Sequence, residues 1–211
     1  MVRISRDPYN VVICGVGGQG NILISQAIGN AVLRKGYRVT IADDIGASQR
    51  AGVVNSKIRI SPKKSCGPLI PEGQAHFVLG LEPLETLRML YRYGNPGVLT
   101  LTNIAPLFPA EVLNKRVQYP DIDELKNAIS SLSKRAWFVD ATSIALDLGA
   151  VIVTNVVLLG TLIALNKIPL TRNDIERELR TNLSAQKLSI NLEALRLGYE
   201  IPGVQNMINN P

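Results

Sequence analysis

The chain has 211 residues, of which 46% are hydrophobic and 19% charged, so it can bury a substantial core and is not intrinsically disordered. No uncharged apolar stretch reaches the ~18 residues that a membrane span needs. The formal net charge of +6 weakly favours an acidic partner or an anionic ligand. Basic residues are spread along the chain and no aromatic-plus-basic strip is present, so we expect no nucleic-acid binding.

The first half of the chain predicts alternating strands and helices. Val11–Cys14 is a short apolar run followed by glycines, as in a buried parallel strand. A helix is predicted over 21–35, because its apolar residues recur on one face and Gly36 can end it. A second strand is predicted over 37–42. A third is predicted over 53–60, where apolar and polar residues alternate as in a half-exposed strand.

The second half continues this pattern and then becomes helical from about residue 142. A proline- and glycine-rich loop is expected over 62–73. The whole pattern predicts one α/β domain over 1–211, a three-layer sandwich with a mostly parallel sheet and a helical C-terminal third at about 142–200. Further strands are predicted over 77–81, 98–102 and 136–139, and further helices from Glu82-Pro83 and over 122–132, 151–165, 172–183 and 185–197.

Cysteine usage and the N-terminal segment bear on compartment and cofactors. Cys14 and Cys66 are the only cysteines, and we expect both to be reduced thiols. Two cysteines cannot supply the usual four ligands of an iron–sulfur cluster, so we expect no metal site on this chain. The first residues lack the basic-then-apolar order of a signal peptide, which favours a cytoplasmic protein.

A glycine-rich loop follows the first predicted strand. Gly15–Gly20 reads G-V-G-G-Q-G, and the acidic pair Asp43-Asp44 ends the second strand, as in the fingerprint of dinucleotide-binding folds. Glycines let a backbone approach a ligand closely, and a helix N-terminus offers N–H groups to an anion. A tight turn without a ligand is the alternative interpretation. Gln19 adds an extended amide that a pyrophosphate site does not require.

The sequence resembles a known family at this loop and at Ser48–Gly52, which reads S-Q-R-A-G. Together they are similar to the gamma-type subunit of 2-oxoacid:ferredoxin oxidoreductases, and most similar to the beta subunit of the indolepyruvate type. Where that family commonly has a glutamate and a histidine before S-Q-R, this chain has Asp43-Asp44 followed by Ile45, so no role of that histidine transfers. Later segments agree in the same order: Ser56–Ile60, Pro68–Gly73, Leu79–Glu85, Asn155–Gly160 and Asn191–Tyr199.

The resemblance implies a multi-subunit enzyme. Such enzymes oxidatively decarboxylate a 2-oxoacid on thiamine diphosphate, transfer the acyl group to coenzyme A, and pass electrons through [4Fe–4S] clusters to ferredoxin. The indolepyruvate type acts on aryl pyruvates. It implies that thiamine diphosphate and the clusters lie on a larger partner subunit, and that this chain is inactive alone. No catalytic residue is assigned to this chain.

The resemblance also singles out the residues that would face a ligand. Gly17, Gly18, Gln19 and Gly20 would form a loop of backbone donors for an anionic group. Coenzyme A is the ligand we name first, and packing against a partner-subunit loop is the alternative. Ser48, Gln49 and Arg50 would hydrogen-bond a carboxylate or phosphate, Arg50 in bidentate fashion. The alternative for Arg50 is an ion pair with Asp43 or Asp44.

Other residues support simpler interpretations. His76, the only histidine, is expected at a solvated or core-edge position rather than in catalysis. Glu82 and Glu85 are expected to favour a helix start, and Asn155 is expected near an interface. Two alternative functions remain: a stand-alone Rossmann-type oxidoreductase that binds NAD or FAD, and a purely structural interaction subunit.

Overall fold

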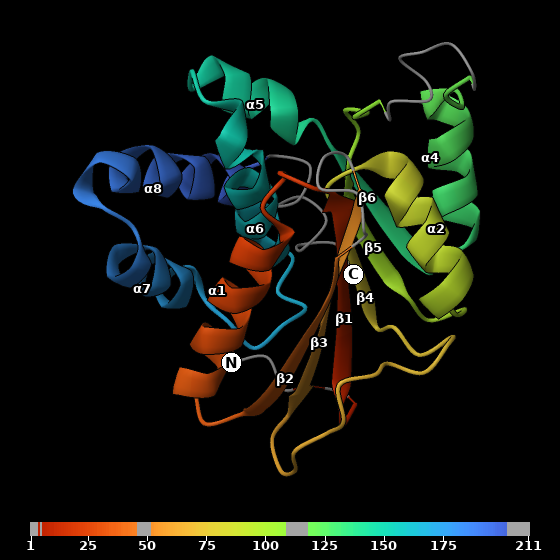
Figure 1. Ribbon diagram of the computed structural model, residues 1–211, viewed down its shortest axis with the longest axis horizontal. Coiled ribbons are helices and arrows are strands. Elements are labelled where there is room, and N and C mark those ends of the chain that lie inside the picture. The colour runs from red at the N-terminus through yellow and green to blue at the C-terminus, as the bar shows by residue number, and fades with distance from the viewer. Residues whose placement is uncertain (1–3, 5, 46–51, 109–117, 202–211) are drawn as a thin grey trace.

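The computed structural model describes residues 4, 6–45, 52–108 and 118–201, which form a three-layer α/β sandwich (Figure 1). Within these ranges six strands make one sheet in the order β2-β3-β1-β4-β5-β6. The strands are β1 (Tyr9–Val16), β2 (Arg38–Ile45), β3 (Val53–Ser61), β4 (Phe77–Gly80), β5 (Leu99–Asn103) and β6 (Arg135–Val139).

The sheet is mostly parallel, as predicted. β1, β4, β5 and β6 pair in parallel, whereas β3 runs antiparallel to both of its neighbours, β1 and β2. The carboxyl ends of β1, β2, β4, β5 and β6 therefore lie at one edge of the sheet. In open α/β sheets this is the edge at which ligands bind.

Helices cover both faces of the sheet, so the three-layer prediction is confirmed. One face carries α1 and the C-terminal helices, and the other carries α2 and α4 (Figure 1). The helices are α1 (Asn21–Arg34), α2 (Pro83–Tyr93), α4 (Ile122–Ser131), α5 (Ala141–Asp147), α6 (Thr154–Ala164), α7 (Arg172–Asn182) and α8 (Ala185–Tyr199), and a 3-10 turn, η1 (Val151–Val153), precedes α6. Among the described residues, no helix combines the length and the hydrophobicity that a membrane span requires.

Each helical layer packs against its own hydrophobic core. The larger core lies between the sheet and the layer of α1, α6 and α8, where Ile13 and Leu79 are fully buried. The smaller core lies beneath α2 and α4 and includes Val12 and Val78. Adjacent residues of one strand thus enter opposite cores, which is why the β1 and β4 sequences are continuously apolar rather than alternating.

The predicted half-exposed character of β3 is wrong. Lys57 is only 4% exposed and Asn55 only 9%, because neighbouring elements cover the face of β3 that carries them. The Lys57 ammonium forms an ion pair with Asp44 on β2 and lies 5.6 Å from the centre of the Tyr93 ring on α2. The polar face of the strand is therefore covered by neighbours that neutralise its charge.

Helices α6 and α8 cross at unusually short range. A Cβ built on Gly198 would lie 1.9 Å from the Val157 carbonyl oxygen, and one on Gly160 would lie 2.3 Å from the Leu195 carbonyl oxygen. The Thr161 hydroxyl donates to the Gly198 carbonyl across this crossing at 3.0 Å. Because α6 is buried on all sides, this packing fixes the position of its N-terminus.

Candidate functional site

The glycine loop lies at the carboxyl end of β1 and leads directly into α1. Gly18 and Gly20 have φ angles of 93° and 83°, which disfavour residues with a Cβ. The Gly17 N–H donates to the Gly52 carbonyl at 2.8 Å. A Cβ on Gly20 would lie 2.1 Å from Nδ2 of Asn155, the second residue of α6. The loop is therefore fixed between the β3 entry and the start of α6.

The Gln19 side chain explains the extra amide in this loop. Its Oε1 accepts a hydrogen bond from the Val16 N–H at 2.7 Å, and its Nε2 donates to the Leu81 carbonyl at 3.1 Å. These two bonds connect the loop after β1 to the end of β4. Gln19 thus stabilises the shape of the site, and the loop backbone provides its exposed surface.

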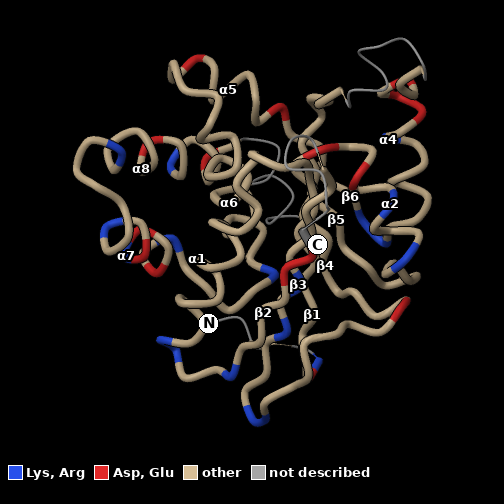
Figure 2. The backbone as a smooth tube through the Cα atoms, in the orientation of Figure 1, with Lys and Arg blue, Asp and Glu red and all other residues tan. Residues whose placement is uncertain are grey.

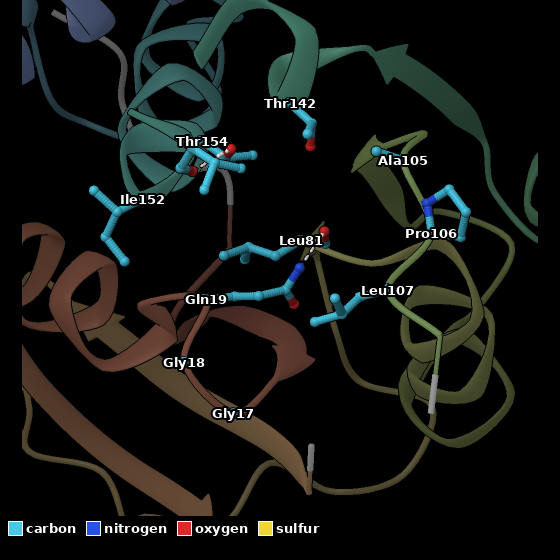
Figure 3. A pocket seen from close by; sticks show the side chains of 11 residues that line it. Gly17, Gly18, Gln19, Leu81, Ala105, Pro106, Leu107, Thr142, Ile152 and Thr154 are labelled. Carbon is cyan, nitrogen blue, oxygen red and sulfur yellow. Dashed lines mark hydrogen bonds between the residues drawn. The ribbon is translucent and has the colours of Figure 1, made fainter. Parts of the chain in front are cut away.

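A cavity of about 340 Å³ opens above this loop, at the carboxyl edge of the parallel strands (Figure 3). Figure 3 shows the glycine loop below it, Thr142 and Thr154 at the starts of α5 and α6 above it, and the loop after β5 beside it. The starts of three helices therefore surround one space. The Asp140 carboxylate caps α5 and accepts the Ser143 N–H, so the starts of α1 and α6 are the ones that favour an anion here. The lining residues are Gly17, Gly18, Gln19, Leu81, Ala105, Pro106, Leu107, Thr142, Val151, Ile152 and Thr154.

The rim of this cavity is apolar and exposed. Leu107 and Val151 are large hydrophobic residues that line it and remain open to solvent, and Ile152 is 65% exposed. Phe108, next to Leu107 in the chain, is also exposed. Exposed apolar residues that gather around a pocket mark a surface suited to a protein partner.

Glu82 directly follows Leu81, which lines the cavity, and begins α2. Its side chain is 1% exposed, and as the N-cap of α2 it accepts the Glu85 N–H at 2.8 Å. It also accepts a hydrogen bond from the Tyr119 hydroxyl, which is 37 residues away in sequence. Burial raises the pKa of Glu82, and its hydrogen bond from Tyr119 opposes this rise. The helix-start prediction for Glu82 is confirmed, whereas no local pattern predicts the contact with Tyr119.

The acidic pair does not lie where a dinucleotide site needs it. Strand β3 is inserted between β1 and β2, so the end of β2 is two strand spacings, about 10 Å, from β1 instead of one. Asp44 forms an ion pair with Lys57, and Asp43 accepts the Ser56 hydroxyl at 2.5 Å. The spacing of the fingerprint is met in sequence but not in space.

The second predicted segment lies mostly outside the described residues. Ser48, Gln49 and Arg50 fall there, so their contacts, including a pair between Arg50 and Asp43 or Asp44, stay predictions. Its last residue, Gly52, is described and accepts the Gly17 N–H. That bond joins the end of the segment to the glycine loop.

Two further residues occupy structural positions. The His76 Nδ1 accepts the Asn10 N–H at 2.9 Å, and its ring stacks on Tyr9, which agrees with the core-edge prediction. The Asn155 Nδ2 donates to the Gly20 carbonyl at 3.5 Å, while its buried Oδ1 has no hydrogen-bond partner among the described residues. Asn155 therefore contacts the glycine loop directly, and an interface role for it stays a prediction.

Comparison with known proteins gives a consistent result. The family model for pyruvate ferredoxin/flavodoxin oxidoreductase matches residues 10–201. The chain belongs to this family. It is 35% identical over 193 residues to the indolepyruvate oxidoreductase subunit IorB of Thermococcus kodakarensis. The alignment covers 91% of this chain and 95% of the relative.

Solved structures of the family share its fold. The pyruvate oxidoreductase subunit PORC of Thermotoga maritima aligns with a TM-score of 0.65 at 20% identity, over 92% of this chain and 97% of that one. The 2-oxoglutarate:ferredoxin oxidoreductase of Magnetococcus marinus aligns with a TM-score of 0.73 at 18% identity, over 96% of this chain but only 32% of that one. The fold thus occurs both as a separate chain and as part of a longer one.

Proposed function

We propose that the chain is the cluster-free subunit of a 2-oxoacid:ferredoxin oxidoreductase that acts on indolepyruvate or a related aryl pyruvate. The observation that carries the proposal is the near full-length match to indolepyruvate oxidoreductase subunits, 35% identical over 91% of this chain. The open cavity at the carboxyl edge, with its apolar rim, supports a shared site that a larger subunit completes. We place this complex in the cytoplasm.

The redox cofactors fit the larger subunit rather than this chain. Cys14 is buried in β1 and Cys66 lies in the loop after β3, and the sequence has no further cysteine. The usual set of four thiolates for a [4Fe–4S] cluster is therefore missing here. We assign the clusters and thiamine diphosphate to the larger subunit, which would pass electrons to ferredoxin.

Coenzyme A is the ligand that we propose for the cavity at the glycine loop. Helix N-termini and a glycine backbone around one space suit a phosphate-bearing group. The family structure from Magnetococcus marinus is described with coenzyme A and succinyl-CoA bound. In this chain the backbone of Gly17, Gly18 and Gly20 would hold the anionic part, with Gln19 keeping the loop in shape. The alternative occupant is a loop of the larger subunit.

Purification of the assembled complex tests the function. We expect a tagged chain to co-purify from the native cell with a larger subunit that contains iron and thiamine diphosphate. The complex should reduce ferredoxin with indolepyruvate in the presence of coenzyme A, faster than with pyruvate. A chain that purifies without a partner would contradict the proposal. A complex that prefers pyruvate would contradict the proposed substrate class.

A pair of glycine variants tests the ligand assignment. Gly18 and Gly36 both have positive φ, at 93° and 85°, and a Cβ on either meets no atom within 4 Å. Gly18→Ala and Gly36→Ala therefore carry the same backbone strain, about 1 kcal/mol, but only the first adds a methyl group to the cavity. We expect Gly18→Ala alone to raise the KM for coenzyme A about tenfold in the complex. Equal KM values for both variants would favour the partner-loop alternative.

A substitution of Arg50 distinguishes a subunit with an active-site role from a purely structural one. If Arg50 binds a carboxylate or phosphate, Arg50→Ala should lower turnover of the complex about tenfold or more while assembly persists. Arg180→Ala, at an exposed site on α7, is the matched control. Full activity of the Arg50→Ala complex would contradict an active-site role for Arg50 and would favour the interpretation as a purely structural subunit.

A further inference from the structure

A second cavity lies at the opposite edge of the sheet, where the parallel strands begin. Its volume is about 410 Å³, and β1 alone spans eight residues, about 25 Å, between the two edges. Figure 2 shows Lys and Arg gathered along this edge, the lower one in the view. The residues that give the cavity its character are Arg6, Tyr9, His76, Lys134, Asn166 and Lys167.

The three cations of this cavity have no carboxylate partner in the described ranges. None of Arg6, Lys134 and Lys167 forms an ion pair there. Of the 17 acidic residues only Glu111 lies outside the described ranges, and none of the other acidic residues lines the cavity. Asp7, beside Arg6 in the chain, is exposed and does not line it either.

The dipoles of two helix C-termini offset only part of this positive charge. Lys134 follows the C-terminus of α4 and Lys167 follows that of α6, where basic residues offset the helix dipole. Each helix end contributes about −0.5 of a charge. Two ends therefore offset about one of the three positive charges, and Arg6, which precedes a strand, has no such explanation.

Neutral donors complete the cavity. The His76 Nδ1 accepts the Asn10 N–H, so the ring proton is on Nε2, which can donate. Burial, followed by the charge of Arg6, lowers the pKa of His76, so the ring stays neutral near pH 7. Asn166 leaves α6 with a φ of 55°, and its exposed amide adds a further donor and acceptor.

We propose that this amino-edge cavity binds a phosphate or pyrophosphate group of a small molecule. Two lysines and an arginine around one space provide charge for a doubly negative group, and both ammonium and guanidinium groups bind phosphate oxygens. The His76 and Asn166 side chains supply neutral hydrogen bonds. Because the cavity is separated from the glycine loop by the length of the sheet, this site goes beyond the proposed function and does not depend on it.

Calorimetric titration of the full chain with inorganic pyrophosphate tests this site. We expect Lys134→Gln and Lys167→Gln each to weaken pyrophosphate binding five- to tenfold. Lys64→Gln removes the same charge from an exposed loop position outside the cavity, and it should change binding less than twofold. ADP should compete with pyrophosphate, whereas citrate at equal concentration should not.

The glycine loop also favours anions, so Gly18→Ala separates the two sites. We expect Gly18→Ala to retain the pyrophosphate binding that Lys134→Gln and Lys167→Gln weaken. No measurable binding, loss of binding in Gly18→Ala but not in the two lysine variants, an equal effect of Lys64→Gln, or equally tight binding of citrate would each overturn the proposal. None of these outcomes alters the test of coenzyme A at the glycine loop.

Discussion

Individual residues at the glycine loop show how one side chain can fix a site without facing a ligand. Both the oxygen and the nitrogen of the Gln19 amide form hydrogen bonds within the chain, and Asn155 on α6 contacts Gly20. The sequence identified both positions, but their partners lie up to 135 residues away. Local spacing carries no information about such partners, so the predicted ligand contact of Gln19 could not be distinguished from a structural one.

Gly20→Ala should destabilise the protein more than its backbone strain alone explains. The new methyl group would meet the Asn155 amide at 2.1 Å, in addition to the positive φ. We expect a loss of about 2 kcal/mol or more in the free energy of unfolding, against about 1 kcal/mol for Gly36→Ala. Urea unfolding provides the measurement.

A double-mutant cycle identifies the cause of that loss. Asn155→Ala should recover part of the stability of Gly20→Ala, because it removes the obstructing amide. Strictly additive losses would show that the contact between the two residues is not responsible.

Glu82→Gln should change how stability depends on pH. Burial raises the folded-state pKa of Glu82 above its ordinary value of 4.5. The contribution of this carboxyl group to the free energy of unfolding is therefore fully present below pH 4.5 and is lost as pH rises through the folded-state pKa. Glutamine does not titrate, and it keeps only one acceptor for Tyr119 and the Glu85 N–H. The variant should therefore be less stable than wild type at pH 5, with the deficit shrinking by pH 7.5.

Urea unfolding at the two pH values measures this trend. Glu124→Gln, at an exposed position in the first turn of α4, is the control and should show a nearly constant difference from wild type. A deficit of Glu82→Gln that stays constant or grows with pH would contradict the assignment.

At the scale of elements, the predicted strands and helices match the structure because their signals are local. Glycine ends or begins several of them, and continuous apolar runs mark the strands that are buried on both faces. The exposure of β3 was predicted wrongly for the same reason. Alternation in sequence describes the two faces of a strand, but whether a face is covered depends on which elements pack there, here Asp44 of β2 and Tyr93 of α2.

The crossing of α6 and α8 should tolerate no side chain at Gly198. An added methyl group meets backbone atoms of Val157, which cannot move aside independently. We expect Gly198→Ala to lower the free energy of unfolding by about 3 kcal/mol. The control is Gly29→Ala on α1, where the nearest obstacle is the flexible Cδ1 of Ile41 at 2.5 Å, and we expect a change within about 1 kcal/mol. Similar losses in both variants would contradict the role of the backbone contact.

At the scale of the whole molecule, the order of the strands decides between competing functions. The glycine loop and the acidic pair satisfy a dinucleotide fingerprint in sequence, yet β3 separates β1 from β2. The edge that carries the glycine loop instead combines three helix N-termini with an apolar rim. This arrangement favours a subunit whose site is completed by a partner.

The purified chain should therefore not bind NAD or FAD. We expect a colourless protein whose Tm shifts by less than about 1 °C on addition of either cofactor, since a ligand present at 100 times its Kd would add about 2.7 kcal/mol. A saturable increase in Tm with NAD or FAD would restore the Rossmann-type alternative.

Most of the strands and helices, the mostly parallel α/β class, the glycine loop and membership of the family could be predicted without coordinates, because periodicity, turn residues and ordered motifs are all local signals. The position of β3 between β1 and β2, the hydrogen bond of Gln19 that holds the loop to the end of β4, and the meeting of basic residues from three segments at the amino edge became visible only in three dimensions. These features depend on contacts between residues far apart in the chain, and their register is set by packing rather than by any local pattern.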